Sequence, residues 1–295
     1  MKPSQALRAV LAGTDLSAPS RHAAERAAAL AKAHGAAVTL LHVVSGSEMG
    51  LLRVWSGMGA RTEEALLAQA SAELHTIAAE VAKHTDYPLS ERLSVGAVVA
   101  EVLKAAAEVD ADLIVVGARG AGFVRQLALG STAERLLRKS TRPVLVVRQM
   151  AHEAYLRVLV PVDFSASSAA AITLAQRIAP GAHLVLLHAW QVPFEEKLQF
   201  AGVNAATVEH YRADAQTKAT QQLHQLAAGQ GLPRDAWTPL LVQGNASMLI
   251  VEQEQEQDCD LIVIGKHGVS VVEDLLLGSV TQHVLTQTQA DVLVV

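Results

Sequence analysis

The sequence is poor in residues on which several common classes of protein depend. Aromatic residues make up 3% of the 295 residues, and Cys259 is the one cysteine. So few aromatic rings favour aliphatic packing over a stacking surface for nucleic-acid bases. A single cysteine excludes a disulfide within the chain. We expect Cys259 to be a small buried residue beside a strand, in a protein of the reducing cytoplasm.

Long apolar runs and an excess of positive charge are also missing. No run of 18 apolar residues occurs, so we expect no membrane-spanning helix, and the first residues lack the apolar core of a signal peptide. The net charge of −5 gives no general attraction to nucleic acid. The composition therefore predicts neither a membrane nor a nucleic acid as partner.

The motifs of several nucleotide and hydrolytic enzymes are missing too. The chain has no Gly-x-x-x-x-Gly-Lys-Ser/Thr loop and no Gly-x-Gly-x-x-Gly after a first strand. It also lacks a Gly-x-Ser-x-Gly elbow and a His-Glu-x-x-His metal pair. The 12 histidines show no ligand spacing. We therefore predict no catalytic residue and no metal ligand.

What is present is an alternation of apolar strands and helices. At 51% hydrophobic, the chain can bury two cores, and its length predicts two domains, 1–150 and 151–295. Near-continuous apolar strands alternating with helices indicate an α/β fold with a parallel, doubly wound sheet. In the first half we expect strands at 7–13, 38–44, 89–95, 113–116 and 143–147, and helices at 19–34, 62–84, 97–109 and 131–140; irregular segments are expected at 46–61 and 193–210.

The second half repeats the first. Asp163 lies 148 residues after Asp15, and the same offset relates Gly265 to Gly117 and Gly278 to Gly130. So long an offset indicates duplication of a whole domain rather than a solenoid. The final apolar strands of the halves, 144–147 and 292–295, can pair with each other. We expect this pairing to produce an intramolecular pseudo-dimer, because an unpaired apolar edge favours aggregation.

A glycine pattern follows the fourth strand of each half. Gly117-Ala118-Arg119-Gly120 is followed by nine residues and then Gly130-Ser131, and the second half has the same spacing after Gly265. Backbone N–H groups approach an anion closely where no Cβ intervenes, and a helix N-terminus adds the positive end of its dipole. The pattern predicts a phosphate-binding cradle in each half.

Two further pairs of polar residues end neighbouring strands. Asp15 and Asp163 follow the first strands, where the structural role of an aspartate is to cap the next helix or fix the turn, and its functional role would be to contact a ribose or base edge. We leave these two roles open, since one residue can serve both. His42 and His188 end the second strands, and we expect them to be structural.

The Gly-x2-Gly-x9-Gly-Ser pattern, after an Asp-Leu-Ile-Val strand and before a Val-Leu-Val-Val strand, resembles the universal stress protein family. The resemblance covers both halves, 8–147 and 157–295. It implies two Rossmann-like domains, related to the adenine nucleotide alpha hydrolases, each a five-stranded parallel sheet with helices on both faces. It also implies ATP binding, with no agreed catalytic residue and at most weak hydrolysis.

The resemblance implies nucleotide contacts at strand ends, glycine turns and helix starts. In the first half the positions are Gly13, Asp15, Val43, Val116, Gly117, Gly120, Gly130, Ser131 and Thr132. In the second half they are Pro161, Asp163, Ala189, Ile264, Gly265, Gly268, Gly278, Ser279, Val280 and Thr281. To these we add Arg119 and His267, which lie inside the glycine turns.

The two expected sites differ in detail. Thr281 matches the family's phosphate-side hydroxyl, whereas its counterpart is Ala133. Arg119 and Arg125 make the first loop basic, and the second combines Lys266 with the acidic Glu273 and Asp274. We expect both sites to be competent and do not rank them.

These features indicate a cytoplasmic, nucleotide-dependent regulator of a stress response. The ligand would be ATP, ADP or AMP, with Mg²⁺ or Mn²⁺ as an open companion, and binding would order the loops at 121–129 and 269–277. An unidentified regulatory protein is the expected partner, and a homodimer is a further option. Two alternatives stay open: a slow ATP hydrolase or adenylate-forming enzyme of related fold, and a scaffold that binds no nucleotide.

Overall fold

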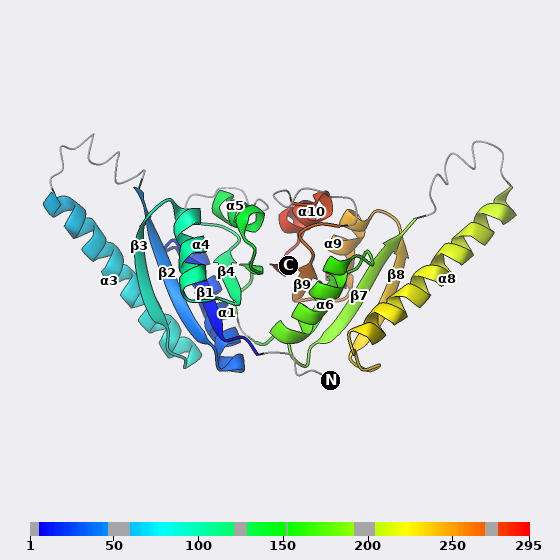
Figure 1. Ribbon diagram of the computed structural model, residues 1–295, viewed down its shortest axis with the longest axis horizontal. Helices are drawn as coiled ribbons and strands as arrows, with labels where there is room; N and C mark the ends of the chain where they lie inside the picture. Colours follow the sequence, from blue (N-terminus) through cyan, green and yellow to red (C-terminus); the bar gives the residue numbers. More distant parts are fainter. Residues whose placement is uncertain (1–5, 47–59, 121–128, 152, 192–203, 269–276) are drawn as a thin grey trace. The chain divides into compact units, whose positions relative to one another are not determined.

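The computed structural model describes residues 6–46, 60–120, 129–151, 153–191, 204–268 and 277–295 (Figure 1). These residues form two compact units. One contains Gln5–Ala154 together with Gln289–Val294, and the other contains Tyr155–Thr288 with Val295. Most of the irregular segment expected at 46–61, and most of the loops at 121–129 and 269–277, lie outside the described residues.

The first unit alternates strands and helices as the sequence predicts. Its strands follow the order β3-β2-β1-β4-β5, and each neighbouring pair is parallel. The elements are β1 (Ala9–Thr14), α1 (Ala18–His34), β2 (Ala37–Ser45), α3 (Ala60–Thr85), β3 (Ser90–Gly96), α4 (Val98–Glu108), β4 (Leu113–Gly117), α5 (Ser131–Lys139) and β5 (Val144–Val147).

The second unit repeats this plan with strand order β9-β6-β7-β8, again parallel. The irregular segment expected at 193–210 is wrong at its end, because α8 already begins at Ala205 with Asn204 as its N-cap. The elements are β6 (Arg157–Pro161), α6 (Ala166–Ile178), β7 (His183–Trp190), α8 (Ala205–Gly229), β8 (Trp237–Gln243), α9 (Ala246–Glu256), β9 (Leu261–Ile264) and α10 (Ser279–Gln287).

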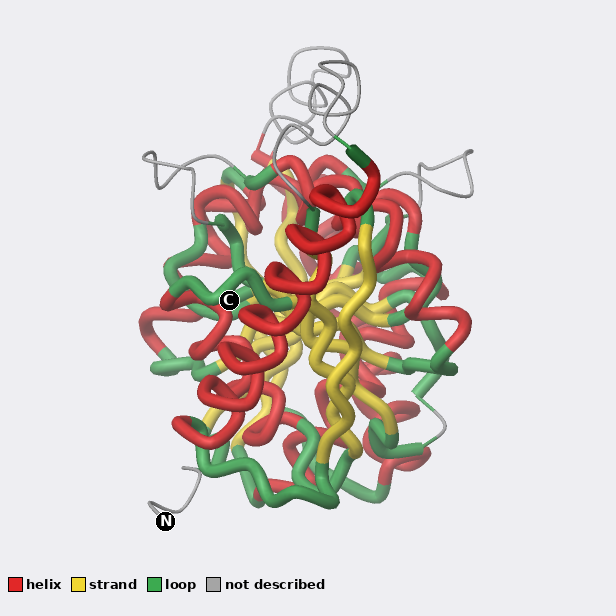
Figure 2. The backbone as a smooth tube through the Cα atoms, turned by 90° about the vertical axis from the view of Figure 1, so that its right-hand side faces the viewer, coloured by secondary structure: helices red, strands yellow, loops and turns green. Residues whose placement is uncertain are grey.

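Helices cover the strands, which explains the apolar strand sequences. In the first unit α1 packs with α3 on one face, and α4 packs with α5 on the other (Figure 1). The strands form the inner layer in Figure 2. Buried on both faces, β4 keeps only Gly117 partly exposed. None of the helices in the described part of the chain is both long and apolar enough to span a bilayer.

Strand order places a switch point at the carboxyl ends of β1 and β4. The chain leaves β1 for β2 on one side and returns through β4 on the other side of β1. Open α/β sheets bind their ligands in the crevice at such a point, because the loops there diverge to opposite faces. The same arrangement recurs in the second unit, where β6 lies between β7 and β9.

The last strand, β10 (Asp291–Val294), completes the first unit. It pairs antiparallel with β5, Leu293 opposite Leu145, which confirms the predicted pairing of the two final strands. Asp291 is fully buried, and one carboxylate oxygen accepts from the backbone N–H of Arg148 at 2.7 Å. Its other oxygen lies 3.4 Å from Nε of Arg26, itself 5% exposed. The register of β10 is thereby fixed by a buried charged pair as well as by backbone bonds.

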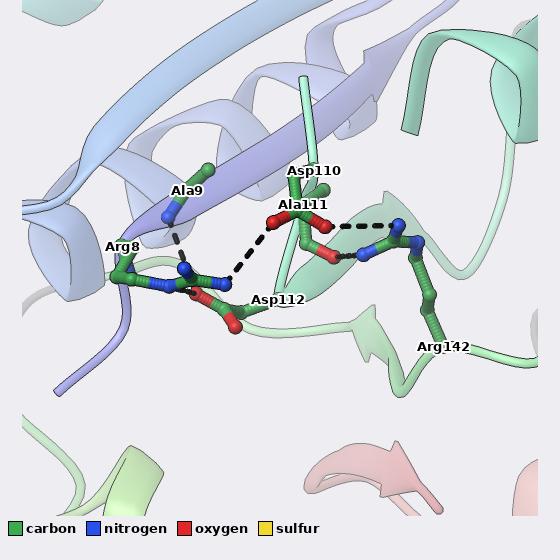
Figure 3. Close-up of polar contacts among 6 residues, drawn as sticks. All are labelled: Arg8, Ala9, Asp110, Ala111, Asp112 and Arg142. Carbon is green, nitrogen blue, oxygen red and sulfur yellow. Dashed lines mark hydrogen bonds and ion pairs between the residues drawn. The ribbon is translucent and has the colours of Figure 1, made fainter. Parts of the chain in front are cut away.

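An aspartate joins β1 and β4 at their amino-terminal ends, opposite the switch point. Asp112 accepts from the backbone N–H groups of Arg8, at 2.7 Å, and Ala9, at 3.4 Å (Figure 3). Asp110 next to it pairs with Arg8 and Arg142 at 3.1 and 3.3 Å, but its side chain is 69% exposed. In the second unit Asp260 takes the role of Asp112, accepting from the backbone N–H groups of Leu156, just before β6, and Arg157, its first residue.

Asp112→Ala should therefore lower the free energy of unfolding by about 1–3 kcal/mol, since it leaves two backbone donors without their acceptor. Urea unfolding of the intact chain measures the change. Asp110→Asn is the matched control, because it removes only exposed ion pairs and should cost less than about 1 kcal/mol. Equal losses in the two variants would contradict this assignment.

Cys259 lies just before β9 and is 6% exposed, which confirms the predicted buried position. Burial raises the pKa of its thiol to about 12, with nearby acidic residues adding to the shift and Arg157 opposing it. Only the thiolate is nucleophilic. Because the folded pKa exceeds that of an unfolded thiol, the unfolded chain ionises first, and the free energy of unfolding falls as the pH rises from about 9 toward 12.

We expect Cys259 to resist alkylation in the folded protein at pH 8 and to react readily once urea unfolds the chain. Mass spectrometry of protein treated with iodoacetamide, with and without urea, measures the difference. Rapid labelling of the folded chain would contradict the buried position.

Candidate functional site

Each unit has a cavity at the carboxyl ends of its central strands. The first has a volume of about 580 Å³ and the second about 190 Å³. All ten sequence-predicted residues of the first half line the first cavity: Gly13, Asp15, Val43, Val116, Gly117, Arg119, Gly120, Gly130, Ser131 and Thr132. All eleven of the second half line the second: Pro161, Asp163, Ala189, Ile264, Gly265, His267, Gly268, Gly278, Ser279, Val280 and Thr281.

The turn after the first strand holds an aspartate at the mouth of each cavity. Oδ1 of Asp15 accepts from the backbone N–H and hydroxyl of Ser17, and Asp163 does the same with Ser165. The residue between them takes positive φ, 66° at Leu16 and 63° at Phe164. Such a conformation is uncommon for residues other than glycine, and it clusters at functional sites.

The second oxygen of each aspartate faces a glycine of the phosphate turn. A Cβ on Gly120 would overlap Oδ2 of Asp15, and a Cβ on Gly268 would lie 2.8 Å from Oδ2 of Asp163. Only glycine therefore lets the turn approach the aspartate this closely. Through Oδ1, Asp15 and Asp163 fix the turn before the helix, as predicted, whereas the N-caps of α1 and α6 are Ser17 and Ser165. Contact of either aspartate with a ligand stays a prediction.

The cradle itself consists of backbone. The N–H of Gly130 donates to the carbonyl of Ala118 at 2.8 Å, and the N–H of Gly278 donates to Lys266 at 3.0 Å. These glycines are the N-caps of α5 and α10, so neither helix start is capped by a side chain of its own N-cap residue. The first-turn N–H groups are oriented for an anion at this end of the helix.

Acidic charge is directed away from the first helix start. Glu134 lies in the first turn of α5, where a carboxylate would repel a bound anion. Its Oε1 pairs with Arg138 one turn further along at 2.8 Å. The first turn of α10 carries no acidic residue.

A histidine within β2 and another within β7 contact the carboxyl end of the neighbouring strand beside each cavity. Nδ1 of His42 contacts the carbonyl of Thr14 at 2.9 Å, and Nδ1 of His188 contacts the carbonyl of Val162 at 2.8 Å. A carbonyl only accepts, so Nδ1 carries the proton in each ring. This confirms the structural role predicted for both histidines, which also line the cavities.

The second cradle carries two hydroxyl contacts that sequence reasoning missed or interpreted differently. The Ser167 hydroxyl lies 3.0 Å from the carbonyl of His267, to which it can donate, and 2.7 Å from the hydroxyl of Ser165. The buried Thr281 hydroxyl donates to the carbonyl of Gly265 at 2.8 Å. Thr281 thus uses its one proton within the protein instead of presenting it to a phosphate. Counting by the repeat offset, the first-half counterparts are Pro19 and Ala133, which have no hydroxyl.

Two other differences surround the second cavity. Phe164 packs on the ring of His188 with centroids 4.3 Å apart, where the first half has Leu16. Both ring nitrogens of His267 are buried and make no hydrogen bond to a described residue, whereas Arg119 occupies the matching place in the first half.

Close contact between the turn and α6 gives a stability test. A Cβ on Gly265 would lie 2.8 Å from Cβ of Ser167, so Gly265→Ala should destabilise the fold by about 1–3 kcal/mol through overpacking. Gly229→Ala is the control, since no heavy atom of a described residue lies within 4 Å of its Cβ position. Thermal unfolding compares the two, and equal melting temperatures would show that the approach is not tight.

Comparison with known proteins assigns both halves to one family. The model of the universal stress protein family matches residues 6–148 and again 154–295. A universal stress protein of Mycolicibacterium smegmatis is 30% identical over 307 residues, covering 97% of this chain and 96% of that protein. Universal stress protein Rv2623 of Mycobacterium tuberculosis is 30% identical over 193 residues, which cover 63% of this chain and 61% of that protein.

Solved structures support the fold over the whole chain. A universal stress protein from Archaeoglobus fulgidus superimposes with a TM-score of 0.69 at 20% identity, covering 99% of this chain and 96% of that one. A functionally unknown protein from Pseudomonas aeruginosa gives a TM-score of 0.66 at 19% identity, covering 100% and 94%. At these identities the likeness concerns the fold alone.

Proposed function

The chain belongs to the universal stress protein family, with one family domain in each half, and we propose that it is a nucleotide-dependent regulator that binds ATP, ADP or AMP. The observation that carries this proposal is the first cavity. It has about 580 Å³ at the switch point of the sheet, within the range of about 300–1,000 Å³ typical of ligand pockets. Its rim is the glycine cradle at the start of α5.

The groups around this cavity would contact different parts of the nucleotide. The adenine lies toward Val43 at the end of β2, the ribose beside Asp15, and the phosphates on the backbone of 130–132. Gly117 and Gly120 keep the turn free of side chains where the ribose and phosphates pass. Arg119 adds a positive charge on the same loop. Pro161, Asp163, Ala189 and the second glycine turn have the corresponding roles in the second half.

The proposed mechanism is occupancy rather than catalysis. The described residues of the cradle offer backbone N–H groups and hydroxyls, which bind phosphates without transferring them. Binding would change the surface that the chain offers to a regulatory partner. Whether a divalent cation joins the nucleotide is tested by titrating with and without Mg²⁺.

Gly130→Glu combined with Gly278→Glu should abolish nucleotide binding while the fold is retained. Each substitution places a carboxylate where the phosphates would lie, so charge repulsion and bulk act together. Isothermal titration with ATP, after stripping bound ligand, measures binding. Mass spectrometry of the untreated protein identifies any co-purified nucleotide.

The control for added charge is Gly229→Glu, at the open end of α8 far along the chain from either cradle. This variant should bind like the original protein, and circular dichroism should show folded chains in all cases. Absence of ATP, ADP and AMP binding by the original protein would refute the proposal and favour a scaffold. Steady turnover near 1 per second or above would instead indicate an enzyme.

A further inference from the structure

We propose that the two halves bind nucleotide in separate concentration ranges, the first half tightly and the second weakly, because two hydroxyls hold the second cradle closed. This inference rests on the proposed function and concerns how nucleotide concentration would regulate the same two sites. The pair of hydrogen bonds from Ser167 to His267 and from Thr281 to Gly265 is called here the hydroxyl clamp.

The clamp fixes the segment over which a nucleotide would pass. Gly265–His267 follows β9 directly, and each end of it accepts one hydroxyl, from the start of α6 at one side and from α10 at the other. Thr281 is 3% exposed, so its bond is shielded from water. The backbone of Gly265 also packs tightly against Ser167, since a Cβ on Gly265 would lie 2.8 Å from Cβ of Ser167.

The first half cannot form this clamp from the matching positions. Pro19 and Ala133 replace the two hydroxyl residues, while the backbone bond that closes the turn is present in both halves, from Gly130 and from Gly278. Both halves therefore have the backbone bond of the cradle, and the second half adds the two hydroxyl bonds. Arg119 stands in the first turn at the position of His267 and carries a permanent positive charge.

Cavity size agrees with this difference. The second cavity, at about 190 Å³, falls below the range of about 300–1,000 Å³ typical of ligand pockets, whereas the first lies within it. A nucleotide entering the second half must therefore expand the cradle. Expansion moves Gly265–His267 and breaks the clamp.

The expected size of the effect follows from the two bonds. Breaking one neutral hydrogen bond corresponds to roughly a two- to tenfold loss of affinity. Breaking both should make the second half about tenfold or more weaker than the first. A chain with these properties responds to nucleotide in two steps, first by filling the first half and then by opening the second.

The test is isothermal titration of the intact, stripped protein with ATP and Mg²⁺. Two binding events should appear, about tenfold or more apart in dissociation constant. Gly130→Glu should remove the tight event and leave the weak one, and Gly278→Glu should do the reverse. Two events of equal affinity would overturn the clamp inference while leaving the proposed function standing; no event at all would overturn the proposed function.

Removing the clamp supplies the second arm. Ser167→Ala with Thr281→Val keeps nearly the same side-chain volumes and deletes both hydroxyls, so the weak event should tighten about tenfold. Ala133→Thr is the matched variant of the first half, and it should weaken the tight event several-fold by supplying a hydroxyl there. An unchanged weak event in the clamp variant would overturn the inference.

Circular dichroism establishes that each variant is folded before titration. If the double variant fails to fold, Ser167→Ala alone removes the more exposed bond and should tighten the weak event about threefold. An unchanged weak event in that folded single variant would also count against the clamp.

Discussion

Parallel pairing of β1 with β4 is the constraint on which the fold and the candidate site both depend. It sets the carboxyl end of β1, with Asp15, beside the glycine turn that follows β4. Residues far apart in the sequence thereby enclose one cavity. The pairing is held at its other end by Asp112, which accepts from the backbone that opens β1. Side chains can therefore differ between the two halves while the strand pairing stays the same in each.

Much of the fold and most of the cavity lining could be predicted from the sequence. Apolar strands separated by helices specify an α/β sheet, because only strands covered on both faces carry such continuous runs. The repeat at 148 residues showed which glycines matter, since Gly117 and Gly265 recur with their spacing intact. Local patterns of this kind are readable because the backbone conformation needs particular residues at fixed positions.

The sequence showed that Thr281 corresponds to Ala133 in the repeat, but not how the hydroxyls of the second half are used. Thr281 matched a family position for phosphate, yet the direction of its hydroxyl depends on where the carbonyl of Gly265 lies in the folded chain. The sequence does not distinguish Ser167, because a serine near a helix start is ordinary and its partner is 100 residues away. The buried pairing of Arg26 with Asp291 likewise depends on β10 joining β5. All three contacts join residues that are far apart in the sequence or on different elements, so they depend on the folded structure.

The place of β10 has a consequence for how the chain is made. Arg148, which follows β5, and Asp291, which opens β10, are 143 residues apart, so a ribosome adding about 5–20 residues per second separates their synthesis by roughly 7–30 s. During that interval the first half can fold, but the apolar edge of β5 lacks its native neighbour. On a crowded polysome the nascent first half is then the stage most exposed to edge-to-edge association, and pairing of β10 with β5 ends that exposure.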